Sequence, residues 1–472
     1  MSAAARLVFP ALRWRVSTGF GHERARIDAT LKIGVGGYIL FGGRPDDVRN
    51  LTAELQSAST HPLLIGSDLE RGAAQQFDGL THLPPAAALG FLGNRDLSRR
   101  CGEITAREAR SVGVNWVYAP VADLDIEPDN PIVQTRSFGD DRAAVAGMVA
   151  AWVAGAQASG VAATVKHYPG HGRTTLDSHA TLPVVEKLFA ELEAQDLEPF
   201  RAAVTAGVRS VMTAHVAYPG WDASGVPATL SKTILGYLRD RLRFTGPVVT
   251  DAFIMEGALR GRGPNRAAVE AIAAGCDALL YPSDPLAVAA ALGRAGAGPA
   301  FRARVDNAVE RVGELAESMR VAEAPAPDAA AHRAFAAATA DLAVHTLRGE
   351  SLRLVEPLAI TVVDDDVGGP YLVGPRDIFA KTLQAGGVRT GGAASRVTAI
   401  YCEPRSWKGR AALGQRSVTA LRGLAGSTAL FVLFGHPRLL GQVPGDAPVV
   451  CAWHGQPLMQ EAAARWVLGR LR

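Results

Sequence analysis

Cysteine is scarce in this 472-residue chain, which contains only Cys101, Cys276, Cys402 and Cys451. The four are far apart in the sequence, so there is no CxxC pair and neither a zinc ribbon nor a thioredoxin-type motif is expected. Four cysteines in a chain this long do not form a disulfide framework. We expect all four to be buried as small apolar side chains.

An excess of one charge is also missing, because 49 basic residues face 46 acidic ones for a net charge of +3. This balance argues against nucleic acid or an anionic membrane as a partner. No run of eighteen apolar residues occurs, so no membrane span is expected. Near the N-terminus the apolar runs are interrupted by Arg6, Pro10, Arg13 and Arg15, so the sequence predicts no signal peptide and a cytoplasmic location.

Short apolar runs alternate with longer segments of helix-forming residues over residues 1–321. The runs are continuous rather than alternating, as expected for strands covered on both faces. They are Gly37–Phe41, Leu63–Ser67, Trp116–Pro120, Ala162–His167, Ser210–Ala214, Val248–Asp251 and Ala278–Tyr281. Seven or eight such repeats predict an α/β fold of the (β/α)8 type, a TIM-like barrel.

Polar side chains stand at or just after several of these predicted strands. They are Asp68, Lys166, His167, His215 and Asp251. The carboxyl ends of the strands carry the active site in barrels of this type. We therefore expect these side chains to gather at one end of the barrel.

A second, smaller unit follows a Pro/Ala-rich linker, which we place at residues 322–334. Residues 335–472 are expected to form an α/β sandwich domain. Its predicted elements are a helix around His332–Arg348, further helices including Gln460–Arg472, and strands at Ala359–Val363, Val397–Tyr401, Ala429–Phe434 and Pro448–Ala452.

The densest polar cluster is Lys166–His179, with three histidines, a lysine and an aspartate in fourteen residues. Asp177 and His179 are two positions apart, so the carboxylate can orient the imidazole as an acid/base near neutral pH. A solvated surface loop is one alternative. A metal site of His167, His171 and His179 is another, but Lys166 would repel a cation, and we expect no metal.

A second segment, Val248–Gly257, reads VVTDAFIMEG. Asp251 ends a predicted buried strand, where a carboxylate is suited to act as a nucleophile towards an oxocarbenium-like centre. The alternative is an aspartate that caps the N-terminus of a helix.

Together, KHYPGHGRTTLDSH (166–179) and VVTDAFIMEGA (248–258) closely resemble glycoside hydrolase family 3, in particular its β-N-acetylglucosaminidase branch. PLLIGSDLE (62–70), NPIVQTRSFGDD (130–141) and AIAAGCDALLYP (271–282) agree with this resemblance, and LFGHPRLL (433–440) agrees more weakly.

The resemblance implies a retaining exo-hydrolase that releases terminal β-linked N-acetylglucosamine from muropeptides or chitin-derived oligosaccharides. Asp251 would be the nucleophile and His179, paired with Asp177, the general acid/base. The sugar hydroxyls would be bound by Asp68, Arg136, Lys166 and His167. The partner is thus a carbohydrate substrate, no cofactor is implied, and the oligomeric state is left open.

The sequence departs from the family pattern at residues 70–76. The usual acidic-Gly-Gly-Arg-Val-Gln-Arg reads Glu-Arg-Gly-Ala-Ala-Gln-Gln, so Ala73 and Gln76 replace two arginines. Either Gln76 donates a neutral hydrogen bond to the sugar, or Arg71 reaches in from a shifted loop. His215 either lines the pocket or is buried with its polar atoms satisfied.

Two other functions stay open at this point. One is a β-glucosidase or related β-glycosidase of the same family. The other is a sugar-binding protein without turnover, which the altered segment 70–76 favours and the intact Asp177, His179 and Asp251 oppose.

Overall fold

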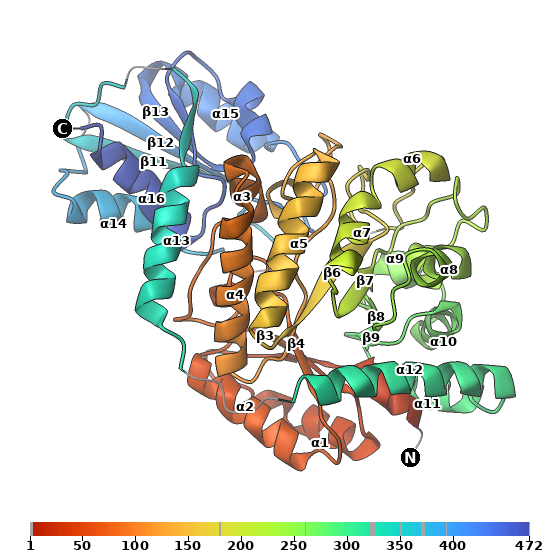
Figure 1. The fold of residues 1–472 in the computed structure, drawn as a ribbon. Coiled ribbons are helices and arrows are strands. Elements are labelled where there is room, and N and C mark those ends of the chain that lie inside the picture. The colour runs from red at the N-terminus through yellow and green to blue at the C-terminus, as the bar shows by residue number, and fades with distance from the viewer. Residues whose placement is uncertain are drawn as a thin grey trace.

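The computed structural model describes residues 3–178, 181–259, 261–320, 326–349, 352–369, 373–392 and 394–471. Its first part is a barrel of parallel strands surrounded by helices (Figure 1). The strands are β1 (Val8–Phe9), β2 (Ala11–Arg13), β3 (Gly37–Phe41), β4 (Leu64–Ser67), β5 (Trp116–Val117), β6 (Ala162–Tyr168), β7 (Ser210–Thr213), β8 (Val248–Thr250) and β9 (Leu279–Leu280).

The barrel closes through its first and last strands. Strands β2 to β8 form a seven-stranded parallel sheet in chain order. Strand β9 joins β8 through the Val249–Ala278 bridge and pairs in parallel with β1. Only Pro10 separates β1 from β2, because proline has no N–H to donate and interrupts the ladder. The two segments act as one barrel strand, and the predicted (β/α)8-like barrel is confirmed.

The helices follow the strands in sequence and cover the outside of the barrel. They are α1 (Arg24–Ile33), α2 (Pro45–Ala58), α3 (Ala86–Leu92), α4 (Arg95–Ser111), α5 (Arg142–Ala158), α6 (Phe189–Ala194), α7 (Glu198–Thr205), α8 (Lys232–Asp240), α9 (Glu256–Leu259), α10 (Pro264–Ala274), α11 (Pro285–Ala295) and α12 (Pro299–Ser318). Several have the expected starts: Asn94 and Asp141 cap α4 and α5, and α10 to α12 each begin with proline.

The second part is a five-stranded sheet with the strand order β10-β14-β13-β12-β11. Its elements are α13 (Ala329–Ala343), β10 (His345–Arg348), β11 (Leu358–Asp364), α14 (Ile378–Ala385), β12 (Ser395–Cys402), α15 (Gln415–Leu424), β13 (Thr428–Gly435), β14 (Val449–Cys451) and α16 (Pro457–Leu468). Only β10 is antiparallel, and α15 lies on the opposite side of the sheet from α14 and α16 (Figure 1).

Two local predictions for this second part need correction. The expected helix His332–Arg348 ends at Ala343. The last residues of that segment, His345–Arg348, form the edge strand β10 instead. Helix α13 begins at Ala329, inside the range expected as a linker, because Asp328 caps it by accepting a hydrogen bond from the Ala331 N–H. The short strands β1 and β2 were not predicted from the sequence. Pro10 separates them and β2 ends in Arg13, so the segment contains no continuous apolar run.

Buried polar contacts join the two parts. His332 on α13 lies 2.8 Å from the Glu108 carboxylate of α4, which also accepts from both the N–H and the hydroxyl of Thr81. His345 of β10 stacks on Phe91 of the barrel with ring centroids 4.0 Å apart. The apolar core is continuous across this junction, so the sheet domain is held against the carboxyl-end rim of the barrel.

All four cysteines are free and buried, as the sequence predicts. No helix within the described ranges combines the length and apolar character needed to cross a membrane.

A buried charge cluster at the amino end of β8 is expected to stabilise the barrel. Asp277, fully buried, bonds the Val248 N–H at 2.9 Å and pairs with Arg239, Arg304 and Arg311. Asp277→Asn removes the charge that three arginines share, so we expect the free energy of unfolding to fall by about 3 kcal/mol. Thermal unfolding measures this. Asp284→Ala, which removes only an exposed helix cap, should cost about 1 kcal/mol. Equal losses in both variants would contradict the role given to Asp277.

Candidate functional site

A cavity of about 720 Å³ opens at the carboxyl ends of the barrel strands. Most of its lining comes from the segments that follow β2, β3, β4, β6, β8 and β9. Two residues, Pro404 and Ser406, come from the segment after β12 in the second domain. Catalytic groups in barrels of this kind occupy this end, so the cavity is the candidate active site.

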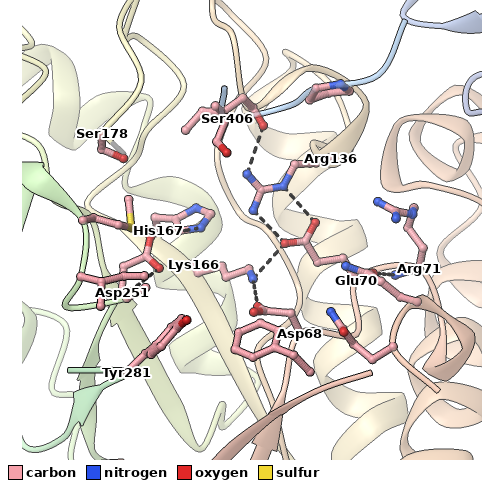
Figure 2. Close-up of a pocket in the computed structure, with 18 of the residues that line it drawn as sticks. Asp68, Glu70, Arg71, Arg136, Lys166, His167, Ser178, Asp251, Tyr281 and Ser406 are labelled. Atoms are coloured by element: carbon pink, nitrogen blue, oxygen red, sulfur yellow. Dashed lines mark hydrogen bonds and ion pairs between the residues drawn. The ribbon is translucent and has the colours of Figure 1, made fainter. Parts of the chain in front are cut away.

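One wall of the cavity is a network of buried ion pairs. The Lys166 ammonium lies 2.7 Å from Asp68 and 2.8 Å from Glu70. Arg136 donates two hydrogen bonds to the Glu70 carboxylate, at 2.8 and 3.0 Å. Figure 2 shows the four side chains side by side, with Lys166 reaching between Asp68 and Glu70. Three of the predicted sugar-binding residues are therefore held together by Glu70.

The charges in this network stabilise one another. Burial alone would raise the pKa of Glu70, but Arg136 and Lys166 outweigh it and hold that pKa well below its usual value. Burial opposes the charge on Lys166 too, yet Asp68 and Glu70 raise its pKa overall. Glu70, Lys166 and Arg136 are thus charged at neutral pH, and charged donors and acceptors make the stronger hydrogen bonds to hydroxyl groups.

Across the cavity, Asp251 follows β8 and His167 stands near the end of β6 (Figure 2). The Asp251 side chain is 21% exposed, and its Oδ2 lies 4.0 Å from His167 Nε2. His167 Nδ1 lies 2.7 Å from the fully buried Asp123 carboxylate. Asp123 fixes the ring, with Nδ1–H donating and Nε2 facing the cavity. The structure therefore brings the predicted nucleophile together with the predicted binding residues.

The polar loop after β6 is held in place by its own side chains. His171 bonds Thr174 at 2.8 Å through Nδ1 and Ser178 at 3.0 Å through Nε2. Burial lowers the pKa of His171 to about 4, so the ring is neutral at physiological pH. Ser178 lines the cavity and Asp177 beside it is buried. His179 lies outside the described residues, so the predicted Asp177–His179 pair stays a prediction.

Gln76 and Arg71 of the altered segment 70–76, the two residues proposed to replace the missing arginine contact, both lie in the cavity wall. Gln76 Oε1 accepts a hydrogen bond from the Gly42 N–H at 3.1 Å, which turns its NH₂ group away from this contact. Arg71 donates to Gln456 of the second domain at 3.2 Å. Arg71 is also attracted by Glu403, although burial lowers its pKa overall. Both residues line the cavity, so neither alternative from the sequence is eliminated.

His215 is the one predicted site residue in the described chain that needs a different interpretation. Its side chain is fully buried, and Nδ1 lies 2.7 Å from the Thr229 hydroxyl. It does not line the cavity. We therefore assign His215 to packing behind the wall, because a strand-end position alone does not decide which way a side chain points.

Several cavity residues were missed in the sequence. Glu70 and Tyr281 stand at strand ends and could have been found by the rule that identified Asp68. Tyr281 has a positive φ of 52°, a strained backbone that is found most often at functional sites. Arg13 and Trp14 follow β2, which was not predicted. Ser406 lies about 340 residues from Asp68, and only the docking of the second domain brings it to the cavity.

The site holds a carboxylate, Asp251, across the cavity from charged hydrogen-bond donors, an arrangement that suits a neutral polyhydroxylated ligand. In the part of the chain that the structure describes, no three His, Cys, Asp or Glu side chains are grouped to hold a metal ion.

Comparison with known proteins agrees with this geometry. The profile of the Glycosyl hydrolase family 3 N terminal domain matches residues 17–315. A beta-hexosaminidase of Thiobacillus denitrificans is 39% identical over 274 residues, which are 56% of this chain and 75% of that protein. A beta-N-acetylglucosaminidase/beta-glucosidase of Cellulomonas fimi is 38% identical over 257 residues, 52% of this chain. The chain spans about half the length of the latter, since only 46% of it is covered.

Solved structures extend the likeness to the second domain. A glycoside hydrolase family 3 beta-N-acetylglucosaminidase from Paenibacillus sp. str. FPU-7 aligns with a TM-score of 0.84 and 26% identity, over 100% of this chain and 96% of that one. A Beta-N-acetylhexosaminidase from Beutenbergia cavernae is 30% identical with a TM-score of 0.59. It covers 67% of this chain and 99% of its own.

The ion network predicts a specific response to acid. Because the pKa of Glu70 is lowered on folding, its stabilisation is complete above the usual glutamate pKa of 4.5 and is lost as the pH falls towards the folded value. Between pH 4 and pH 3, Glu70 should add about 1.4 kcal/mol to the decline in the free energy of unfolding. Urea unfolding at both pH values checks this. Glu70→Gln should be less stable at pH 7 but should lose less stability on acidification, and an unchanged slope would refute the assignment.

Proposed function

Because the chain belongs to glycosyl hydrolase family 3, we propose that this glycoside hydrolase releases terminal β-linked N-acetylglucosamine with retention of configuration. The observation that carries the proposal is Asp251, which stands at a strand end in a cavity whose opposite wall is the Asp68–Lys166–Glu70–Arg136 network. The names of the relatives from Thiobacillus denitrificans and Paenibacillus support the choice of sugar. Muropeptides and chitin-derived oligosaccharides are the substrates we propose.

In the proposed mechanism the terminal sugar lies between Asp251 and the ion network. Asp68, Arg136, Lys166 and His167 hold its hydroxyls through charged hydrogen bonds, with Gln76 as a neutral donor. Asp251 attacks C1 and forms a covalent glycosyl–enzyme. His179, oriented by Asp177, protonates the leaving oxygen and then deprotonates the water that releases the sugar. The two proton transfers use the same group in opposite directions.

His167 also helps to position the proposed nucleophile, Asp251. Asp123 fixes the orientation of its ring, and Nε2 lies 4.0 Å from Asp251 Oδ2, next to the reacting carboxylate. Asp251 itself accepts a hydrogen bond from the Ala252 N–H at 2.7 Å. These contacts hold the carboxylate in place before the substrate arrives, which reduces the reorganisation needed in the transition state.

A β-glucosidase is the second candidate, favoured by the dual name of the Cellulomonas fimi relative and by Gln76 in place of an arginine. The two sugars differ at C2, where an acetamido group replaces a hydroxyl. Turnover of nitrophenyl β-N-acetylglucosaminide and of the β-glucoside separates the candidates. We expect the kcat/KM of the former to be at least tenfold higher, and the reverse order would establish the glucosidase.

Trapping tests the nucleophile directly. A 2-fluoro sugar with a reactive leaving group should label the peptide that contains Asp251, because the fluorine slows breakdown of the covalent intermediate. Asp251→Asn should lower kcat by about 10⁴-fold and abolish labelling. Glu256→Gln, five residues further on and absent from the cavity lining, serves as the matched control. Labelling of another carboxylate would refute the assignment, and sugar binding without any turnover in the unmodified protein would favour the binding-protein alternative.

We also propose the division of the chain that the sequence predicts: a catalytic barrel at residues 1–321, a linker at 322–334 and a sandwich domain at 335–472. It is supported by the end of α12 at Ser318, while the start of α13 at Ala329 makes the second half of the linker helical. The second domain would hold Pro404 and Ser406 in the cavity wall.

A further inference from the structure

The cavity carries more positive charge than a neutral sugar requires. Its lining contains five cations, Arg13, Arg15, Arg71, Arg136 and Lys166, against three carboxylates, Asp68, Glu70 and Asp251. Glycoside cleavage passes through a transition state with positive charge at the sugar ring. Surplus cations nearby oppose that charge, so they are expected only where they serve another purpose.

The surplus lies at one side of the rim. In the deep wall, Arg136 and Lys166 are paired with Glu70 and Asp68. Arg13 and Arg15, at the end of β2, form no ion pair with a carboxylate among the described residues, and the same holds for nearby Arg44. Glu23 accepts a hydrogen bond from the Arg13 backbone N–H at 3.2 Å but forms no ion pair with its guanidinium. A guanidinium that forms no ion pair in a ligand cavity is suited to bind an anionic group of the ligand.

The side chains of Arg13 and Trp14 are fixed in place, and the exposed Arg15 is presented by a loop with a fixed backbone. Arg13 donates to the Tyr281 hydroxyl from Nε and Nη2, at 3.1 and 2.9 Å, and lies 4.4 Å from the centroid of the Phe41 ring. Trp14, half-buried, donates from its indole N–H to Asp47 at 2.9 Å. Mutual backbone hydrogen bonds between Arg15 and Gly19 close the loop that presents Arg15.

Tyr281 adds a hydrogen-bond donor to the same side. Its oxygen accepts both N–H groups of Arg13, which leaves its own hydrogen for another partner. Its strained backbone holds this hydroxyl at the cavity, below Asp251 in the view of Figure 2. Among the described residues that line the cavity, glycine aside, Tyr281 alone has a positive φ.

What Arg13, Arg15 and Tyr281 bind depends on where they lie relative to the terminal sugar. The deep end of the cavity is closed by the buried Lys166–Glu70–Arg136 network, which the terminal sugar faces. The rest of an exo-enzyme's substrate must therefore extend over the rim. A cavity of about 720 Å³ is in the upper part of the range of roughly 300–1,000 Å³ for ligand pockets, which leaves room for part of the leaving group.

We infer that Arg13, Trp14, Arg15 and Tyr281 form a leaving-group subsite that selects leaving groups carrying a carboxylate. Trp14 supplies an apolar face for the body of that group, and the two arginines bind its acid. This inference rests on the proposed hydrolase activity and adds to it the charge of the leaving group, which none of the sugar-binding residues determines.

Two synthetic substrates isolate the charge. They are the 4-carboxymethylphenyl and 4-carbamoylmethylphenyl β-N-acetylglucosaminides, which differ only in acid or amide. A methylene group insulates the phenol from this difference, so the two leaving groups have similar reactivity. The ratio of kcat/KM for acid over amide should be about fivefold to tenfold in the unmodified enzyme, the effect of one charged hydrogen bond at a partly exposed site. It should decline as salt is added.

Arg15→Gln should bring this ratio close to one, because the charge that separates the acid from the amide is removed. Arg294→Gln on α11 is the matched control, because it removes one exposed charge that does not line the cavity, and its ratio should match that of the unmodified enzyme. A ratio of one in the unmodified enzyme, or an unchanged ratio in Arg15→Gln, would overturn the subsite. Absence of turnover with both glycosides would instead overturn the proposed activity.

Discussion

The site depends on a carboxylate that does not itself need to touch the substrate. Glu70 shares its two oxygens between Arg136 and Lys166, and Lys166 in turn holds Asp68. Without Glu70, two cations would be buried side by side with only Asp68 to balance them. Arg136 would then move towards solvent, and Lys166 would do the same or lose its charge. With it, three side chains from the ends of different strands hold fixed charges in one wall of the cavity. The barrel geometry brings these groups near each other, and the ion pairs give them a single arrangement.

The same principle extends outwards in successive layers. Asp123 fixes His167, which faces Asp251, and Asp123 also accepts a hydrogen bond from the His171 N–H at 2.7 Å. The loop that leads to the proposed acid/base is thus tied to the group that orients the binding histidine. On the other side, Arg71 connects the altered segment 70–76 to Gln456 and Glu403 of the second domain. Binding, nucleophile and domain contact are therefore connected through buried hydrogen bonds rather than through apolar packing alone.

The sequence predicted the barrel because buried parallel strands leave continuous apolar runs, and it predicted Asp68, Lys166 and Asp251 because polar residues directly after such runs are conspicuous. It missed β2 because an arginine and a proline interrupt a strand of three residues. It could not decide the position of His215, because the same strand-end pattern fits a side chain that points into the wall. Ser406 could not be predicted for a different reason. Its position depends on how the two domains dock, and no local sequence pattern around residue 406 indicates that contact.

The wall that the second domain contributes has a consequence for how such an enzyme diversifies. Pro404 and Ser406 lie on a segment whose own anchors, Glu403 and Lys408, belong to the sandwich domain. Changes in length or side chain between those anchors alter the outline of the cavity without touching a barrel strand. Replacement of the whole domain by another would do so on a larger scale. Bond cleavage and part of the substrate choice can therefore evolve on separate structural units.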